Sequence, residues 1–534
     1  MVKATLFSAQ QDSKGITGIV AADREIRPWH GLIYEEAWMA IRTPQQYVES
    51  LKDGRAVYCL GERVKDVTQH PILRICIDWM AMDYVLQQDP RYQSLVTEKT
   101  EERELGSFVF MPQTSVEDLL RLREIVKLWA RVCYGKPPGA KFVGKDGLNA
   151  VTVVSQRIDK KHGTNYAERV EAYRKYLLKT DASIALGMTD VKGDRSLRPS
   201  KQQPHQDYYV RIVDERKDGI VVRGAKAHIS EAPLANEIII LPCRAMREDD
   251  KAYAVSFAVQ ANARGLTLIS AEPEIKESGN FFDNPITASI YLNDAMVIFD
   301  DVFIPNEQVF LKGEWPYAGD IAYMFGNFHR LSAETYKAVE LELVAGAAAL
   351  MAEYNGVEKI SHIQDKLAWL VLYAEATEVM GRSACEHCVS EPDSNLVYPN
   401  PMYANIAKFF FADNWHQATK YLQDIAGGIV ATAPSSKDYL NPEIHDLIDK
   451  YLGGKAGIST EYRLRLIKLI RELTSSYEDV LTLHAEGSLA AQRLSIYALA
   501  DFEKYKAAAK RAARIKDGTK DSTYSQLPEF PPKI

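Results

Sequence analysis

The spacing of the apolar residues changes twice along the chain, and this change restricts the possible folds more than any other feature. Between residues 43 and 128 apolar residues recur every three or four positions, which is typical of amphipathic helices. Between residues 181 and 305 short β-branched and aromatic runs are separated by Gly, Pro and Asn, which indicates strands. From residue 333 to 510 long helical patterns return, with an Ala-rich stretch at 344–352 that suits close helix packing. We therefore expect an α+β protein in the order helices, β unit, helices.

Local signals mark where some of these elements begin. Thr43 and Ser115 each precede a helical run, and Ser115 with Asp118 three residues later resembles a capping box. The polar, Pro-containing residues 517–534 should form a tail. The runs most typical of strands are at 208–213, 219–223, 237–241 and, less regularly, 286–299.

Composition excludes several classes of protein. Hydrophobic residues make up 46% of the 534 residues and charged residues 26%, as in globular proteins, and the net charge of −7 argues against a nucleic-acid partner. Six irregularly spaced cysteines do not form a disulfide framework. No run of about 18 apolar residues or export signal is present in the sequence. We expect a cytoplasmic protein that does not span a membrane.

Known cofactor-binding and metal-binding motifs are weak or lacking in the sequence, so they do not identify a function. Cys385, His387 and Cys388 could begin a metal site, but a second close cysteine pair is lacking in the sequence, so small residues on a helix face are the favoured interpretation. The sequence contains neither a nicotinamide-binding glycine motif nor a P-loop. If the protein performs redox chemistry, its reducing equivalents should come from another protein.

Three segments are open to more than one interpretation. The polar loop from Met188 to Ser196 could hold a heteroaromatic cofactor or be a solvated turn. Gly427 and Gly428 could direct backbone N–H groups at a phosphate or simply end a helix. His329 lies near a domain junction, where sites tend to form, although a single histidine is often structural.

Taken together, five segments resemble the 4-hydroxyphenylacetate 3-hydroxylase family in order and spacing, over nearly the whole chain. This family combines flavin-dependent aromatic monooxygenases with 4-hydroxybutyryl-CoA dehydratase. The sequences of the matching segments are more similar to the dehydratase branch. The resemblance implies an acyl-CoA dehydrogenase-like fold with an N-terminal helical domain (1–180), a middle β-barrel-like domain (181–315) and a C-terminal helical bundle (316–534), usually as a homotetramer. The segments are Arg55–Pro71, Thr189–Arg195, Gly224–Lys226, Phe328–Arg330 and Gly427–Ser436.

The same resemblance implies FAD as the cofactor and a set of residues that hold it. In the family the turn Ile229–Ala232 and the loop that matches Met188–Ser196 lie along the flavin. Gly427 and Gly428 match a turn that meets the FAD pyrophosphate across a subunit boundary, so a dimer or tetramer is required. The candidate cofactor residues of the first two segments are Met188, Thr189, Asp190, Asp194, Arg195 and Ser230.

The sequence departs from both branches at their reactive positions. The dehydratases hold a [4Fe–4S] cluster with three cysteines and the His of Phe-His-Arg, and the corresponding residues here are Pro138, Phe142, His329 and Tyr336. Since only His329 is retained, we expect no iron–sulfur cluster and no other metal. In the hydroxylases an Arg and a Tyr meet the substrate phenol; here Lys136 replaces the Arg and the Tyr is missing.

These departures favour a two-component monooxygenase. A separate reductase would supply reduced FAD, O₂ would form the flavin C4a-hydroperoxide, and a phenol-like aromatic substrate would be hydroxylated. Lys136 would anchor the substrate, while His329 and Tyr336, seven residues apart on one helix face, would supply hydrogen bonds or a proton relay. The alternative is a cluster-free lyase, isomerase or desaturase acting on an acyl-CoA or related acid, with His329 as general base. A flavin-free oligomeric binding protein is the third possibility.

Overall fold

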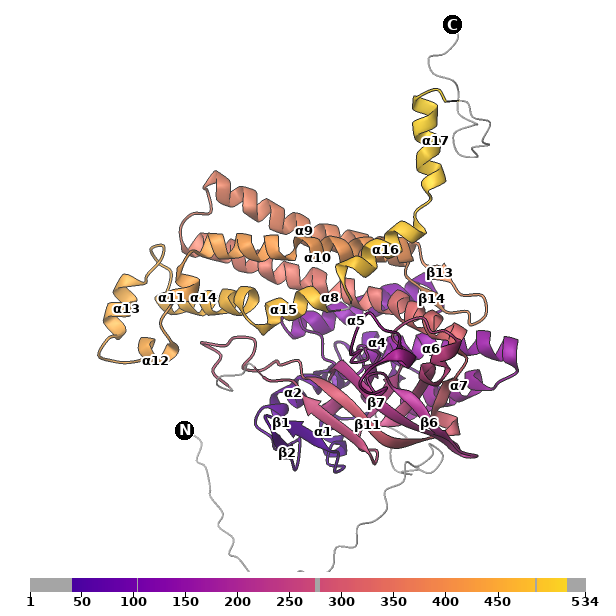
Figure 1. The fold of residues 1–534 in the computed structure, drawn as a ribbon. Helices are drawn as coiled ribbons and strands as arrows, with labels where there is room; N and C mark the ends of the chain where they lie inside the picture. The colour runs from indigo at the N-terminus through magenta and orange to yellow at the C-terminus, as the bar shows by residue number, and fades with distance from the viewer. Residues whose placement is uncertain (1–40, 103, 274–278, 486, 516–534) are drawn as a thin grey trace, which may run out of the picture.

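The structure, a computed structural model, describes residues 41–102, 104–273, 279–485 and 487–515. Long helices form one layer, and the strands with most of the N-terminal helices form a second layer beneath it (Figure 1). Among the described helices, none is long and apolar enough to cross a membrane. The tail predicted at 517–534 lies outside the described residues.

The N-terminal region is largely helical, as predicted, and both predicted helix starts are confirmed. The Thr43 hydroxyl accepts a hydrogen bond from the Gln46 N–H (3.0 Å), and the Gln46 side chain accepts one from the Thr43 N–H (2.8 Å). Ser115 and Asp118 form the same reciprocal pair. Each pair satisfies backbone donors that the first helical turn leaves free. The helices are α1 (Pro44–Ser50), α2 (Leu73–Met80), α3 (Met82–Gln88), α4 (Gln93–Val96), α5 (Val116–Val132), α6 (Gly144–His162) and α7 (Tyr166–Thr180).

Part of this region was predicted incorrectly, because it contains strands. β1 (Val57–Cys59) and β2 (Glu62–Val64) form a hairpin whose turn includes Gly61 at a φ of +83°. β1 also pairs in parallel with β10 (Leu266–Ser270), about 200 residues later in the chain. Such a distant partner leaves no local signal, so the hairpin was assigned to the helical region. Two further short strands, β3 (Thr97–Glu98) and β4 (Gly106–Ser107), pair with each other.

The middle of the chain forms two sheets that are linked by an isolated bridge between Asp190 and Lys226. The larger sheet has the order β2-β1-β10-β11-β7-β6, and the smaller one has the order β12-β9-β8-β5. The prediction of a mixed helical and β chain is confirmed, whereas one sheet closed into a barrel is not observed among the described strands. The remaining strands are β5 (Ile184–Gly187), β6 (Arg211–Glu215), β7 (Gly219–Ser230), β8 (Glu237–Ile240), β9 (Val255–Gln260), β11 (Asp294–Pro305) and β12 (Val309–Lys312).

Individual strand predictions met with mixed success. The runs at 219–223 and 237–241 are confirmed as β7 and β8, and the run at 208–213 is displaced to β6. The strand predicted at 286–299 begins only at Asp294, because the Glu472 carboxylate accepts the Ile286 N–H (2.7 Å) and holds the preceding segment in turns. β5, β9, β10 and β12 were not predicted. β9 is buried along almost its whole length, and such a short apolar run does not distinguish a strand from a buried helix.

A glycine inside β7 allows the chain just before β6 to approach β7 closely. Gly224 has a φ of +130°, and a Cβ at this position would lie 2.4 Å from the Tyr209 carbonyl oxygen.

We expect Gly224→Ala to lower the free energy of unfolding by about 2–4 kcal/mol, because it combines backbone strain with a clash against main chain. Urea denaturation measures this loss. Gly61→Ala is the matched control, since Gly61 also has a positive φ but nothing lies within 4 Å of its Cβ position; an equal loss in both variants would disprove the clash.

The C-terminal region forms the helical layer, and its first helix begins before the helical pattern predicted from residue 333. α8 starts at Ala318 rather than near residue 333, since glycines and aromatic residues at 318–332 obscure the helical pattern. A short hairpin of β13 (Val389–Ser390) and β14 (Val397–Tyr398) interrupts the helices. The helices are α8 (Ala318–Tyr354), α9 (Ser361–Glu386), α10 (Pro401–Ala426), α11 (Ile429–Thr432), α12 (Ser436–Tyr439), α13 (His445–Tyr451), α14 (Thr460–Ser475), α15 (Tyr477–His484), α16 (Leu489–Leu499) and α17 (Phe502–Ala512).

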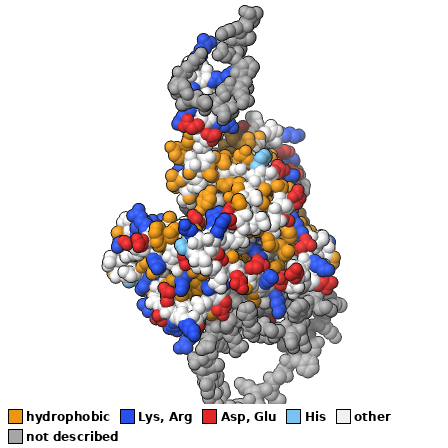
Figure 2. Space-filling model, turned by 90° about the vertical axis from the view of Figure 1, so that its right-hand side faces the viewer, with side chains coloured by type: hydrophobic (Ala, Val, Ile, Leu, Met, Phe, Trp, Pro, Cys, Tyr) orange, Lys and Arg blue, Asp and Glu red, His pale blue; other side chains and the backbone are white. Residues whose placement is uncertain are grey.

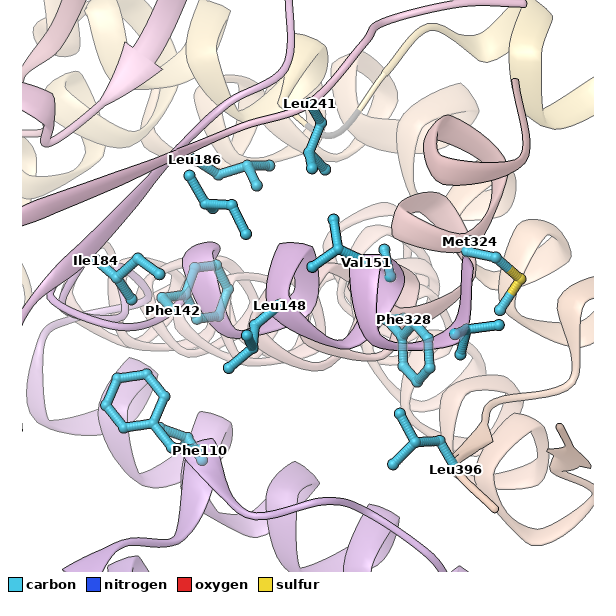
Figure 3. Packing of buried hydrophobic residues seen from close by; sticks show 14 of the residues in the cluster. Phe110, Phe142, Leu148, Val151, Ile184, Leu186, Leu241, Met324, Phe328 and Leu396 are labelled. Atoms are coloured by element: carbon cyan, nitrogen blue, oxygen red, sulfur yellow. The ribbon is translucent and has the colours of Figure 1, made fainter. Parts of the chain in front are cut away.

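α6 lies in the core between the sheets and α8. Figure 3 shows Leu148 and Val151 of α6 with side chains of the β unit on one side and Phe328 of α8 on another. Most residues of the first two turns of α6 are buried, including the charged Lys145 and Asp146. A helix start buried in this way needs polar partners, and α8 supplies them. The labelled core residues are Phe110, Phe142, Leu148, Val151, Ile184, Leu186, Leu241, Met324, Phe328 and Leu396.

Candidate functional site

The first turn of α6 and the middle of α8 bring four polar side chains together. His329 Nδ1 lies 2.8 Å from Asp146 Oδ2, and Ser332 Oγ donates to the same oxygen (3.2 Å). Lys145 Nζ donates to Asp146 Oδ1 (2.6 Å) and to Ser332 Oγ (2.8 Å). All four residues are at most 3% exposed. We call Lys145, Asp146, His329 and Ser332 the histidine network.

The charge on Asp146 determines which nitrogen of His329 carries a proton. Burial alone would raise the pKa of Asp146, but the Lys145 ammonium and the hydrogen bond from His329 outweigh it and hold this pKa below its ordinary value. An ionised carboxylate only accepts hydrogen bonds, so His329 must donate from Nδ1. In the neutral imidazole Nε2 is then the acceptor, and among the described residues it has no hydrogen-bond partner. The network therefore fixes the orientation of the imidazole and makes Nε2 the acceptor of its neutral form.

Aromatic rings surround His329. Phe325, one turn earlier on α8, stacks on its imidazole at a centroid distance of 5.1 Å. Phe142 meets the edge of the imidazole at 5.9 Å and the ring of Tyr336 at 5.7 Å. Trp129 of α5 packs against the other side of Phe142 at 6.3 Å. Apart from the histidine network, His329 therefore contacts aromatic rings of the protein.

This arrangement does not fit an iron–sulfur cluster. Phe142 and Tyr336 occupy two of the positions where the resemblance places cysteine ligands, and their rings pack against each other. Pro138 occupies the third position. Within the described part of the chain, no group of three or more His, Cys, Asp or Glu side chains could hold a metal ion. Without thiolate donors the retained His329 is available for other chemistry.

Lys136 lies near Tyr336 but already has protein partners. Its Nζ donates to the Glu340 carboxylate and to the Thr482 hydroxyl (2.8 Å). Its carbonyl oxygen accepts a hydrogen bond from the Trp79 indole N–H (3.0 Å). The predicted substrate anchor is thus a cation held in place at both its backbone and its side chain.

Lys226 holds the predicted cofactor loop against β7. Its buried Nζ donates to Asp190 Oδ2 (2.9 Å), to the Met188 carbonyl oxygen (3.0 Å) and to the Leu241 carbonyl oxygen (2.8 Å). Asp190 Oδ1 in turn accepts the Val210 N–H (3.0 Å). The Asp190 carboxylate is therefore part of the support of this loop, and both of its oxygens already have protein partners.

Two hydroxyl groups along β7 could face a heteroaromatic cofactor. The Thr189 carbonyl oxygen accepts the Ala227 N–H (2.8 Å), while the half-buried Thr189 hydroxyl makes no hydrogen bond to any described residue. Ser230 Oγ donates to Asp294 Oδ1 (2.6 Å), and burial raises the pKa of Asp294. Ala227, which pairs with Thr189, and Ser230 are three residues apart along β7, a separation of roughly 10 Å at most. This edge therefore fits the length and the hydrogen-bonding groups of a flavin ring.

The other predicted cofactor residues lie apart from this edge or at its exposed end. The Asp194 carboxylate accepts from the Ser196 N–H (2.9 Å) and hydroxyl (2.7 Å), which closes an exposed turn. The exposed Arg195 has no hydrogen bond or ion pair with any described residue. Gly427 and Gly428 follow α10 at the surface, and the adjoining α11 lies at the opposite end of the helical layer from β7 (Figure 1).

Several residues of the site were missed by the sequence analysis. Lys145, Asp146, Ser332, Lys226 and Asp294 were not proposed there for any role. The one usable signal was two adjacent charges, Lys145 and Asp146, within an apolar helix, because such charges are buried only when paired.

Two family models match the chain. A model described as "4-hydroxyphenylacetate 3-hydroxylase N terminal" matches residues 43–311, and one described as "4-hydroxyphenylacetate 3-hydroxylase C terminal" matches residues 318–514.

Among similar proteins, the 4-hydroxybutyryl-CoA dehydratase/vinylacetyl-CoA-Delta-isomerase of Clostridium aminobutyricum is 34% identical over 502 residues, covering 89% of this chain and 100% of the relative. The 4-hydroxyphenylacetate 3-monooxygenase oxygenase component of Thermus thermophilus is 31% identical over 440 residues, covering 82% and 89%.

Solved structures show similarity to both branches. An oxygen-tolerant 4-hydroxybutyryl-CoA dehydratase from N. maritimus has a TM-score of 0.84 at 32% identity, covering 90% of this chain and 97% of that chain. The oxygenase component of 4-hydroxyphenylacetate 3-monooxygenase complexed with FAD has a TM-score of 0.80 at 28% identity, covering 89% and 98%.

Proposed function

This chain belongs to the 4-hydroxyphenylacetate 3-hydroxylase family, and we propose that it is the oxygenase component of a two-component, FAD-dependent monooxygenase. Its substrates are O₂ and a small phenol-like aromatic molecule, and a separate reductase supplies reduced FAD. The observation that carries the proposal is the histidine network beside aromatic rings. Phe142 and Tyr336 replace ligand positions of the dehydratase, and His329 Nε2 is left free to act on a substrate.

Reduced FAD would lie along the edge formed by Met188, Thr189 and Ser230, with Asp194 and Arg195 toward its polar end. A similar solved oxygenase contains FAD, which supports this assignment. When bound, the reduced cofactor supplies the electrons that activate O₂. The Asp190–Lys226 pair serves the site indirectly, because it holds the loop that carries Met188 and Thr189.

The residues around His329 prepare the substrate. Nε2 accepts the phenol proton, which makes the ring more electron-rich and therefore more reactive toward oxygen transfer. Lys136 holds an anionic group of the substrate, sharing its charge with Glu340, and Tyr336 completes the proton relay. Phe142 and Phe325 limit the access of water to the reacting atoms.

We further propose that the protein is a cytoplasmic homotetramer or dimer. Gly427 and Gly428 precede α11, which lies at the opposite end of the helical layer from β7 (Figure 1), so they would serve the cofactor of a neighbouring subunit. α9 exposes Val371 (52%) and Val379 (61%), as expected of a surface that another subunit covers. Figure 2 shows further apolar side chains below the projecting C-terminal end. Exposed apolar residues of α16 and α17 are Leu494, Tyr497, Leu499, Phe502 and Tyr505.

Arg195 gives a direct test of the cofactor site. We expect Arg195→Ala to weaken FAD binding by about 1.5–3 kcal/mol, roughly 10- to 150-fold, because one charge-assisted hydrogen bond is lost. Fluorescence titration with FAD measures the dissociation constant. Lys201→Ala is the control, since it removes an exposed cation of the same region that pairs with Asp249. Equal affinities for the parent protein and Arg195→Ala would remove Arg195 from the site.

Stopped-flow absorbance tests the reaction itself. Anaerobically reduced FAD bound to the protein is mixed with O₂-saturated buffer, with and without a phenol. A long-lived species between reduced and oxidised flavin, followed by a hydroxylated product, is expected. Direct reoxidation that releases hydrogen peroxide, with every phenol tested, would refute the monooxygenase.

The alternative function is an oxygen-independent lyase or isomerase that acts on an acyl-CoA or related acid, with His329 as general base. The 34% identity to the dehydratase of Clostridium aminobutyricum and the TM-score of 0.84 to that of N. maritimus favour it. Anaerobic incubation of the FAD-loaded protein with 4-hydroxybutyryl-CoA or vinylacetyl-CoA, followed by mass spectrometry, would detect this activity.

In either case we expect the anaerobically purified protein to contain less than about 0.1 mol of iron and of acid-labile sulfide per chain, because the cysteine ligands of a cluster are replaced. Ferrozine and methylene-blue assays measure both, with a cluster-containing dehydratase as the positive control. Near-stoichiometric iron and sulfide would contradict the assignment of Phe142 and Tyr336 to ligand positions.

A further inference from the structure

Glu231 lies in a conformation that side chains of its type rarely adopt. It follows Ser230 at the end of β7 with a φ of +63° and a ψ of +7°, in the left-handed region that favours glycine. Its side chain is nevertheless buried, at 1% exposure. Strained residues that the surrounding structure holds in place cluster at functional sites.

The carboxyl group of Glu231 is incompletely paired. Its backbone N–H donates to the Asn293 carbonyl oxygen (2.9 Å), and its Oε1 accepts the Asn293 N–H (3.1 Å). Its Oε2 has no hydrogen-bond partner among the described residues, and the same holds for the nearby Tyr291 hydroxyl and the Asn293 amide nitrogen. Burial holds the pKa of Glu231 well above its ordinary value, and Asp294 of β11 raises it further. The fold therefore keeps a costly group at this position.

The other side of Glu231 faces the turn at residues 135–140. A Cβ at Gly139 would lie 2.3 Å from Glu231 Cγ, so only glycine permits this contact. The same turn carries Lys136, whose carbonyl oxygen is bound by the Trp79 indole N–H. Glu231 thus joins Ser230, on the cofactor side of the site, to the turn that carries the substrate anchor.

We propose that Glu231 is a positioning residue that sets the separation between the substrate-binding turn 135–140 and the cofactor-binding end of β7. The inference rests on the proposed roles of Lys136 and Ser230. Glu231 acts through its packing against Gly139. A substrate turn placed wrongly by even 1 Å loses much of the rate, because oxygen transfer requires close alignment.

Two substitutions of Glu231 separate positioning from simple packing. Glu231→Gln keeps the shape of the side chain and its packing against Gly139, so it should retain the parent properties. Glu231→Gly relieves the backbone strain but removes the contact with Gly139. The Km for the aromatic substrate should rise about 10-fold in Glu231→Gly, with the affinity for FAD unchanged. The melting temperature should change by less than about 4 °C, since strain relief and loss of an unpaired carboxyl offset the void.

Trp79 provides a readout that does not depend on catalysis. The full chain is labelled with 5-fluorotryptophan, and the ¹⁹F resonance of Trp79 is assigned by its loss in Trp79→Phe. Displacement of the turn in Glu231→Gly should shift or broaden this resonance. Asn395→Gly is the matched control, because Asn395 also has a positive φ (+58°) but its side chain is exposed.

The outcomes distinguish the positioning role of Glu231 from the proposed monooxygenase function. An unchanged Trp79 resonance and an unchanged Km in folded Glu231→Gly would overturn the positioning role, as would a large loss of thermal stability with the resonance unmoved. If the parent protein hydroxylates no aromatic compound while the Trp79 resonance still moves in Glu231→Gly, the monooxygenase proposal fails but the control of the turn by Glu231 stands.

Discussion

Replacing Asp146 by asparagine should slow hydroxylation by about 100-fold or more while leaving FAD affinity unchanged. Lys145 Nζ faces one Asp146 oxygen at 2.6 Å and would select the amide oxygen for that position. The amide NH₂ then faces His329 Nδ1, which must become the acceptor. His329 Nε2 would carry the proton and could no longer receive one from the substrate. The hydroxylation rate should therefore fall because the tautomer of His329 changes, and not because the packing is disturbed.

The measurement is the single-turnover rate of product formation at saturating reduced FAD, together with the ¹⁵N chemical shifts of His329. His329→Gln should lose a similar factor. Ser332→Ala is the matched control, because it removes the hydroxyl that donates to Asp146 and accepts from Lys145 but leaves the His329–Asp146 contact in place, so it should cost a few-fold at most. A normal rate in a folded Asp146→Asn variant whose tautomer has changed would exclude His329 as the proton acceptor.

Replacing Lys226 by methionine should lower the free energy of unfolding by about 3–5 kcal/mol, because it leaves the buried Asp190 carboxylate without its cation. Two carbonyl groups, those of Met188 and Leu241, also lose their donor. FAD affinity should fall as well, since the loop that carries Thr189 is no longer held against β7. Urea denaturation and FAD titration measure the two effects.

The double variant Asp190→Asn/Lys226→Met is the control for this prediction. It removes the unpaired charge, so its stability should recover by at least about half of the loss in Lys226→Met. If the single and double variants are equally unstable, the loss arises from the packing of the lysine side chain and not from the buried charge.

The local signals of the sequence predicted the parts of the fold that neighbouring residues determine. The capping pairs at Thr43 and Ser115 and the strands β7 and β8 were correct, because a cap or an alternating pattern depends on residues a few positions apart. The β1–β2 hairpin was missed, because it is stabilised by β10 from a distant part of the chain. The turns before β11 were taken for strand, because their partner is Glu472 of α14.

The features of the candidate site can also be divided into those that the sequence predicts and those that depend on the tertiary structure. By itself the sequence determined the order of the regions, the family resemblance, the residues at the cluster-ligand positions of the dehydratases, including His329, and Lys136 at the position of the hydroxylases' Arg. Only the tertiary structure decided that Asp146 orients His329, that Lys226 holds the cofactor loop and that Glu231 packs on Gly139. The physical reason is that hydrogen bonds and buried charges act over about 3 Å in space, whereas these partners lie tens to hundreds of residues apart along the chain.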